Sequence, residues 1–135
     1  MPGQKYDILV VDDQAGLRRL ICETLFGEGY MIDQAAGGLE AVEKLSRNKY
    51  RLILLDVKMP GMNGLDTLKE IRKINGDVPV VMMTAYDELN IAGDTGYGTG
   101  PVQHISKPFD LDDLRKLVRV NLSDDYDLLS QTIHG

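Results

Sequence analysis

Three carboxylates stand directly after two apolar runs of this sequence. Asp12 and Asp13 follow the run ILVV, and Asp56 follows the run LILL. With an ordinary pKa of about 3.9, an aspartate is ionised at neutral pH, so it can bind a metal or attack phosphorus without a general base. Three carboxylates held together repel one another unless a cation compensates them. Mg²⁺ prefers such oxygen ligands, so we expect a magnesium site here, with Mn²⁺ as an alternative occupant.

Two further expected strands end in side chains that suit phosphoryl chemistry. Thr84 follows the run VVMM, and Lys107 follows QHIS. A threonine hydroxyl can donate to one phosphoryl oxygen and a lysine ammonium can pair with another, which helps to neutralise the group during transfer. A cis bond before Pro108 would fix the loop that aims the lysine. These residues together predict phosphoryl transfer onto Asp56.

Each of these residues has an ordinary explanation when it is taken alone. An aspartate after a strand is commonly a turn former or a helix cap. A threonine at a strand end and a surface lysine need no function. Their joint occurrence at the ends of four expected strands favours a site, because a metal site without chemistry needs neither the threonine nor the lysine.

The elements that must position these residues alternate between strand and helix. Such alternation predicts an α/β fold with a doubly wound, five-stranded parallel sheet and helices on both faces. The expected strand order is 2-1-3-4-5, which brings the carboxyl ends of strands 1, 3 and 4 to one edge. Expected strands span residues 6–11, 30–35, 52–56, 78–83 and 103–106, and expected helices span 14–28, 38–49, 64–75 and 111–122.

A glycine-rich stretch lies where a fourth helix is expected. Gly93, Gly96 and Gly98 each disfavour a helix by about 1 kcal/mol relative to alanine. We therefore expect helix 4 to be short or frayed. Its glycines also predict that this helix is mobile until phosphorylation.

Length and charge narrow the class of protein. The 135 residues fit one domain, which we place at residues 1–122, followed by an acidic C-terminal tail or linker at 123–135. A net charge of −6 argues against direct binding to nucleic acid, and no apolar stretch is long enough to span a membrane. The single Cys22 excludes an internal disulfide and suits the cytoplasm.

Four motifs resemble the receiver domains of bacterial two-component response regulators. LVVDDQ, LLDVKMPGMNG, VMMTAY and SKPFD match that family in order and spacing over about residues 6 to 122. The resemblance implies Asp56 as phospho-acceptor, Asp12 and Asp13 as metal ligands with Asp56 and the Lys58 backbone carbonyl, Thr84 as the switch hydroxyl, and Lys107 as the lysine that pairs with the phosphoryl group. It also implies a signalling phosphoprotein that catalyses its own phosphorylation and dephosphorylation.

Within this family the chain looks most similar to single-domain intermediates of sporulation phosphorelays. The similarity rests on DDQ with Gly16 and Arg18, on TAY with Glu88 and Leu89, and on His104. It implies a sensor histidine kinase or a histidine phosphotransferase as partner, which would dock on the first helix at Leu17, Arg18 and Arg19. His104 takes the place of an aromatic switch residue found in many receivers.

Two alternative functions stay open at this point. A haloacid-dehalogenase-like phosphohydrolase also uses an aspartate nucleophile with Mg²⁺, but it needs a second aspartate two residues after the first, and Gln14 stands two residues after Asp12. A receiver-like binding module without chemistry is expected to lack the acidic pair or the lysine. Both are present here.

Overall fold

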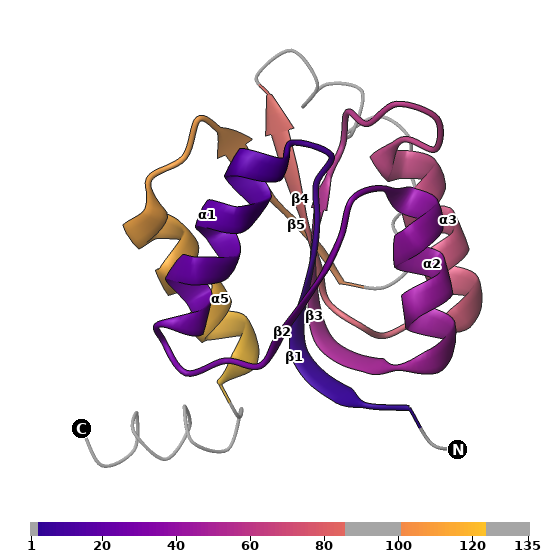
Figure 1. Cartoon of the computed structure of the whole chain (residues 1–135), viewed down its shortest axis with the longest axis horizontal. Helices are drawn as coiled ribbons and strands as arrows, with labels where there is room; N and C mark the ends of the chain where they lie inside the picture. The colour runs from indigo at the N-terminus through magenta and orange to yellow at the C-terminus, as the bar shows by residue number, and fades with distance from the viewer. Residues whose placement is uncertain (1–2, 86–100, 124–135) are drawn as a thin grey trace.

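The computed structural model describes residues 3–85 and 101–123. A five-stranded parallel sheet with strand order β2-β1-β3-β4-β5 forms the centre of the molecule. Figure 1 shows helices α1 and α5 on one face of the sheet and α2 and α3 on the other. This arrangement confirms the predicted α/β fold and strand order. The strands are β1 (Lys5–Val11), β2 (Ile32–Ala35), β3 (Lys49–Asp56), β4 (Val80–Ala85) and β5 (Val102–Lys107), and the helices are α1 (Ala15–Phe26), α2 (Gly38–Arg47), α3 (Gly64–Ile74) and α5 (Leu111–Leu122).

The central strands carry apolar runs, such as Ile8 to Val11 of β1 and Leu52 to Leu55 of β3, because helices cover both of their faces there. Alternate residues of a strand therefore enter two separate cores. Leu9 and Leu55 belong to the core that includes residues of α2 and α3, whereas Ile8 and Leu54 belong to the core that includes residues of α1 and α5. This burial fixes β1 beside β3, with Val11 opposite Leu55 in the register.

Several strand boundaries differ from the sequence prediction by one to three residues; β2, for example, begins at Ile32 rather than at residue 30. β3 begins at Lys49 rather than at residue 52, because Lys49 and Tyr50 pair with Lys5 and Tyr6 although the stretch is not uniformly apolar. β4 begins at Val80 rather than at residue 78. Pro79 lacks the N–H that a strand ladder needs, and it contributes only its carbonyl, which accepts from Ile53.

The helices begin as their sequences predict. Asn63 caps α3 by accepting a hydrogen bond from the Asp66 N–H, and Asp110 caps α5 through the Asp112 N–H. Leu20 continues the apolar spacing of α1 and would be expected to face inward, but it is 46% exposed, and Ile21 and Leu25 carry the contact of α1 with the core. Ile74 likewise continues the apolar spacing of α3, but it is 43% exposed at the last residue of that helix.

Two predicted features fall outside the residues that the structure describes. These are the short or frayed helix 4 with its glycines and the acidic tail beyond Ser123.

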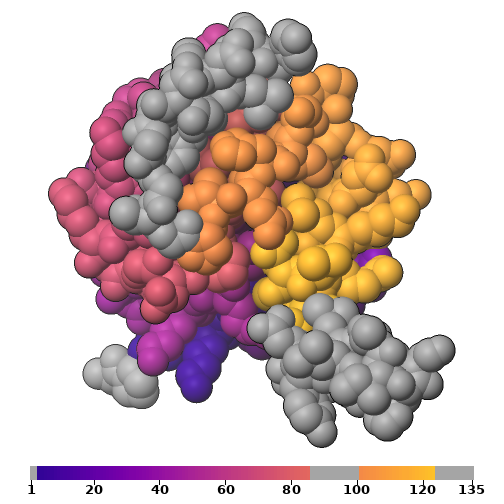
Figure 2. Space-filling view, turned by 180° about the vertical axis from the view of Figure 1, so that it is seen from behind, coloured from indigo at the N-terminus to yellow at the C-terminus, as the bar shows by residue number. Residues whose placement is uncertain are grey.

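β5 and α5 occupy the orange and yellow part of the face seen in Figure 2. Among the helices of the described ranges, none is long and apolar enough to cross a membrane.

Candidate functional site

The predicted acidic cluster forms at the carboxyl ends of β1 and β3. Because these strands are neighbours, Asp12, one residue beyond β1, lies close to Asp56 at the end of β3. Carboxylate oxygens of Asp12, Asp13 and Asp56 all lie within 4.8 Å of one another. Asp12 and Asp56 are buried, whereas Asp13 is exposed to solvent. The cluster therefore has two buried carboxylates and one exposed carboxylate at its rim.

Lys107 reaches this cluster from the far end of the sheet. Its Nζ lies 3.0 Å from Oδ1 of Asp56 and 3.3 Å from Oδ2 of Asp12. Burial disfavours the charged ammonium, but the hydrogen bond to Asp56 and the charges of both aspartates outweigh burial and raise the pKa of Lys107. The peptide bond between Lys107 and Pro108 is cis, as anticipated. The lysine is thus a permanent cation within the site.

The single positive charge of Lys107 does not compensate the negative charges of the two buried carboxylates, Asp12 and Asp56. Burial raises the pKa of Asp56 to about 6, and the charge of Asp12 adds to the rise, against the opposing effects of Lys107 and of a hydrogen bond from the Lys58 backbone. The donor set consists only of oxygens, which suits Mg²⁺. The residues present therefore fit a hard divalent cation. The Lys58 carbonyl as a further ligand stays a prediction.

Thr84 lies on β4, the strand next to β3, one residue after the position that pairs with Asp56. It is fully buried, and within residues 3–85 and 101–123 its Oγ1 has no hydrogen-bond partner. Leaving a buried hydroxyl unpaired costs about 1–3 kcal/mol. No contact within the described residues joins this hydroxyl to the carboxylates, so its role as the switch hydroxyl stays a prediction.

The loop from β3 to α3 folds tightly against Asp56. Gly61 has a φ of +77°, a conformation that favours glycine. A Cβ on Gly64 would lie 2.4 Å from the backbone oxygen of Asp56, so only glycine fits there. Sequence reasoning missed this role of Gly64. The available signal was a second glycine placed at the first turn of a helix, where propensity disfavours it.

His104 is exposed on β5, three residues before Lys107. Side chains an odd number of residues apart point to opposite faces of a strand. The structure therefore does not bring His104 to the carboxylate cluster beside Lys107. Its role as a switch residue stays a prediction.

Comparisons with known proteins agree with this geometry. The family model for the response regulator receiver domain matches residues 8–119. Sporulation initiation phosphotransferase F of Bacillus subtilis is 42% identical over 112 residues, which cover 83% of this chain and 90% of that protein. The transcriptional regulatory protein ZraR of Klebsiella oxytoca is 38% identical over 85% of this chain, but this match spans only 26% of the longer ZraR.

Solved structures of receiver proteins have the same fold. TrrA of Thermotoga maritima, solved with Mg²⁺ and BeF, is 37% identical with a TM-score of 0.75, over 89% of this chain and 99% of that one. The receiver domain of NtrX from Brucella abortus is 32% identical with a TM-score of 0.78, over 86% of this chain and 98% of that one. From its sequence, its fold and its acidic site, the chain belongs to the response regulator receiver domain family.

Proposed function

We propose that Asp56 accepts a phosphoryl group from a phosphohistidine on a sensor histidine kinase or a histidine phosphotransferase. The observation that carries this proposal is the contact of Asp56 with Lys107 inside a cluster of oxygen donors. Membership of the receiver family supports phosphoryl acceptance and signalling as the function of the chain. The alternatives, a phosphohydrolase and a module without chemistry, lack comparable support.

In the proposed reaction a carboxylate oxygen of Asp56 attacks phosphorus. A new P–O bond forms while the P–N bond to the donor histidine breaks, and the imidazole nitrogen leaves with the electron pair. Lys107 lies within hydrogen-bond distance of the nucleophilic carboxylate. Its ammonium can therefore pair with a phosphoryl oxygen and stabilise the negative charge there during transfer. The unpartnered Thr84 hydroxyl would donate to another oxygen.

Asp12, Asp13, Asp56 and the Lys58 carbonyl would hold the Mg²⁺ ion, and Mn²⁺ is an alternative occupant. When bound, the ion supplies positive charge to the phosphoryl oxygens and to the buried carboxylates. The residues of the chain then do two things. They hold the nucleophile at a fixed place, and they keep a second cation, Lys107, 3.0 Å from it and 3.3 Å from Asp12.

A groove beside the site suits a partner that brings the phosphohistidine. It has a volume of about 350 Å³ and is lined by Leu17, Lys107, Pro108 and Phe109. Leu17 thus agrees with the predicted docking on α1. Arg19 is exposed and pairs only with Glu23 among the described ion pairs, so it is also free to meet a partner. The similarity to a protein named a sporulation phosphotransferase supports onward transfer of the phosphoryl group.

Transfer from a phosphorylated histidine phosphotransferase domain tests the proposed function. The wild-type chain should acquire label in the presence of Mg²⁺, whereas Asp56→Asn should not, because an amide is not a nucleophile toward phosphorus. A small phosphomonoester serves as the contrasting substrate. Steady hydrolysis of that ester, without labelling of the protein by phosphohistidine, would favour the phosphohydrolase alternative instead.

A further inference from the structure

Every polar group of Asp12 is held by a contact from a different part of the chain. Its N–H donates to the carbonyl of Ala35, its Oδ1 accepts from the Gln14 N–H, and its Oδ2 accepts from Lys107. Its backbone carbonyl accepts from Nη1 of Arg18 at 2.6 Å. Because Asp12 is fully buried, solvent cannot readily replace these partners. The Arg18 contact therefore fixes the backbone that carries a predicted metal ligand.

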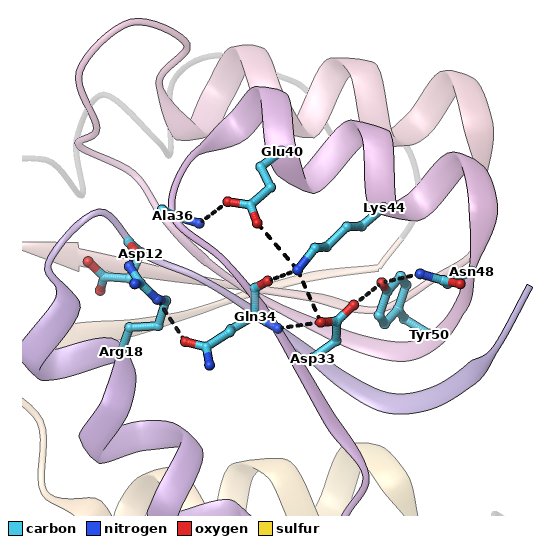
Figure 3. A network of polar contacts seen from close by, with 9 residues as sticks. All are labelled: Asp12, Arg18, Asp33, Gln34, Ala36, Glu40, Lys44, Asn48 and Tyr50. Carbon is cyan, nitrogen blue, oxygen red and sulfur yellow. Dashed lines mark hydrogen bonds and ion pairs between the residues drawn. The ribbon is translucent and has the colours of Figure 1, made fainter.

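Arg18 is itself fixed by Gln34 on β2. Its Nε donates to Oε1 of Gln34 at 2.9 Å, so the guanidinium spans from the β1–α1 loop to the edge of the sheet. Figure 3 shows Arg18 between Asp12 and Gln34. A guanidinium presents several donors in one rigid plane, which lets two contacts be made at once. A lysine ammonium at this position lacks that fork.

The backbone of Gln34 is anchored in turn, as Figure 3 also shows. Its carbonyl accepts from Lys44 at 2.5 Å and its N–H donates to Asp33 at 2.9 Å. Lys44 and Asp33 form an ion pair of 3.2 Å with each other. The Gln34 side chain therefore extends from a fixed point, and it is exposed, so its truncation leaves no cavity in the core.

We propose that Arg18 and Gln34 are positioning residues for the metal site. Gln34 orients Arg18, and Arg18 holds the Asp12 carbonyl. The Asp12 backbone is thereby fixed, so its carboxylate is already in place to bind the ion. Neither residue contacts the ion or the phosphoryl group. This inference rests on the proposed function, because it assigns the two residues to the site that Asp12 shares with Asp56.

The same contacts change the interpretation of the basic pair on α1. Arg18 and Arg19 were both expected to meet a partner protein, yet Arg18 is committed to contacts within the chain. Arg19 points elsewhere, and its side chain is 81% exposed beside Glu23. Arg19 is therefore the matched control for Arg18, since it has the same chemistry on the same helix without the link to Asp12.

Calorimetric titration with Mg²⁺ of the full chain tests the proposal. Loss of groups that orient a metal ligand commonly weakens metal binding by about 10–100-fold, and Gln34 acts one contact further away. We expect Gln34→Ala to weaken Mg²⁺ binding about 3–10-fold and Arg18→Lys about 10-fold. Gln34→Glu keeps the acceptor oxygen for Arg18, so it should bind within about twofold of the wild type. Arg19→Ala should equal the wild type.

Melting curves recorded in EDTA show whether each variant folds. The Arg18 Nε–H signal in NMR spectra of the metal-free protein reports the contact of Arg18 with Gln34. Wild-type Mg²⁺ affinity in both Gln34→Ala and Arg18→Lys would overturn the proposal. So would an equal loss in Gln34→Ala and Gln34→Glu, because the acceptor oxygen would then be irrelevant. Labelling of Asp56 in the wild type is measured separately, so either of these results would leave the proposed phosphoryl acceptance standing.

Discussion

The ammonium of Lys107 and the carboxylate of Asp56 lie 3.0 Å apart across 51 residues of sequence. The lysine comes from the end of β5 and passes the end of β4 to reach the end of β3. It also lies 3.3 Å from Asp12, so it occupies the position between the two buried carboxylates. Two consequences follow, one for reaction rate and one for metal binding.

Replacement of Lys107 by alanine should separate these two effects. Phosphorylation should slow by about 10²-fold or more, because a preorganised charge on the phosphoryl oxygens is lost. Mg²⁺ should bind as tightly as in the wild type or more tightly, because a competing cation has been removed. Labelling rates at saturating Mg²⁺ and a calorimetric titration check the two halves. Weaker Mg²⁺ binding in Lys107→Ala would contradict this account of the lysine.

Asp56 should make stability depend on pH in the metal-free protein. Its pKa rises from the ordinary 3.8 to about 6 on folding, so between these values the folded state binds more protons. Stability from this group is therefore present below pH 3.8 and is lost as pH rises through 6. At pH 7 Asp56→Asn should be more stable than the wild type by about 1–3 kcal/mol.

Urea unfolding of both proteins in EDTA, from pH 4 to pH 7, measures this difference. The gap should shrink as the pH falls toward 4, where the carboxyl is protonated in the folded state and close to half protonated in the unfolded state. Saturating Mg²⁺ should also reduce the gap at pH 7, because the ion stabilises only a folded chain that can bind it. A gap that stays constant over this pH range would show that burial of the Asp56 charge is not its origin.

The unpartnered hydroxyl of Thr84 predicts opposite effects on stability and on phosphorylation. Thr84→Val removes a buried, unpaired polar group while keeping the shape, so the unphosphorylated protein should gain up to about 1 kcal/mol. The phosphorylated protein should lose a donor to the phosphoryl group, whereas Thr84→Ser should retain it. Unfolding curves and the lifetime of the phosphorylated form check both. Destabilisation of the unphosphorylated Thr84→Val protein would indicate that the hydroxyl has a partner in the folded chain.

Gly64 is required by the close approach of α3 to Asp56. A Cβ there would lie 2.4 Å from the Asp56 oxygen and 2.6 Å from Cα of Val57, so Gly64→Ala should destabilise the protein by about 2–3 kcal/mol. Gly16 provides the control, since it lies in α1 and its Cβ would meet nothing within 4 Å. Gly16→Ala should stabilise by about 0.5–1 kcal/mol. Equal effects of the two substitutions in urea unfolding would refute the steric argument.

The strands and the residues at their ends could be predicted because burial and polarity change abruptly there. Leu52 to Leu55 are buried on both faces, and Asp56 ends the run where the sheet ends. The order of the strands then places Asp12 and Lys107 beside Asp56 without any knowledge of side-chain contacts. This logic fails for the N-terminal part of β3, which is not an apolar run. There the ring of Tyr50 stacks on the ring of Tyr6, with 5.4 Å between the ring centroids.

Other features depend on contacts that no local pattern encodes. Arg18 and Arg19 are neighbours on one helix, yet only Arg18 reaches Gln34, which is 16 residues away. Leu20 continues the apolar spacing of α1 but lies beyond the narrow stripe that contacts the core. Gly64 looks like a poor helix former until the path of the Asp56 backbone is known. Such features need the three-dimensional arrangement.

The central claim is that Asp56 is the phosphoryl acceptor. The most direct test is treatment of the wild-type chain with phosphoramidate and Mg²⁺, followed by peptide mass spectrometry. We predict one added phosphoryl group, in the peptide containing Asp56, that disappears when EDTA replaces Mg²⁺. A phosphoryl group on any other residue, or full labelling of Asp56→Asn, would contradict the account.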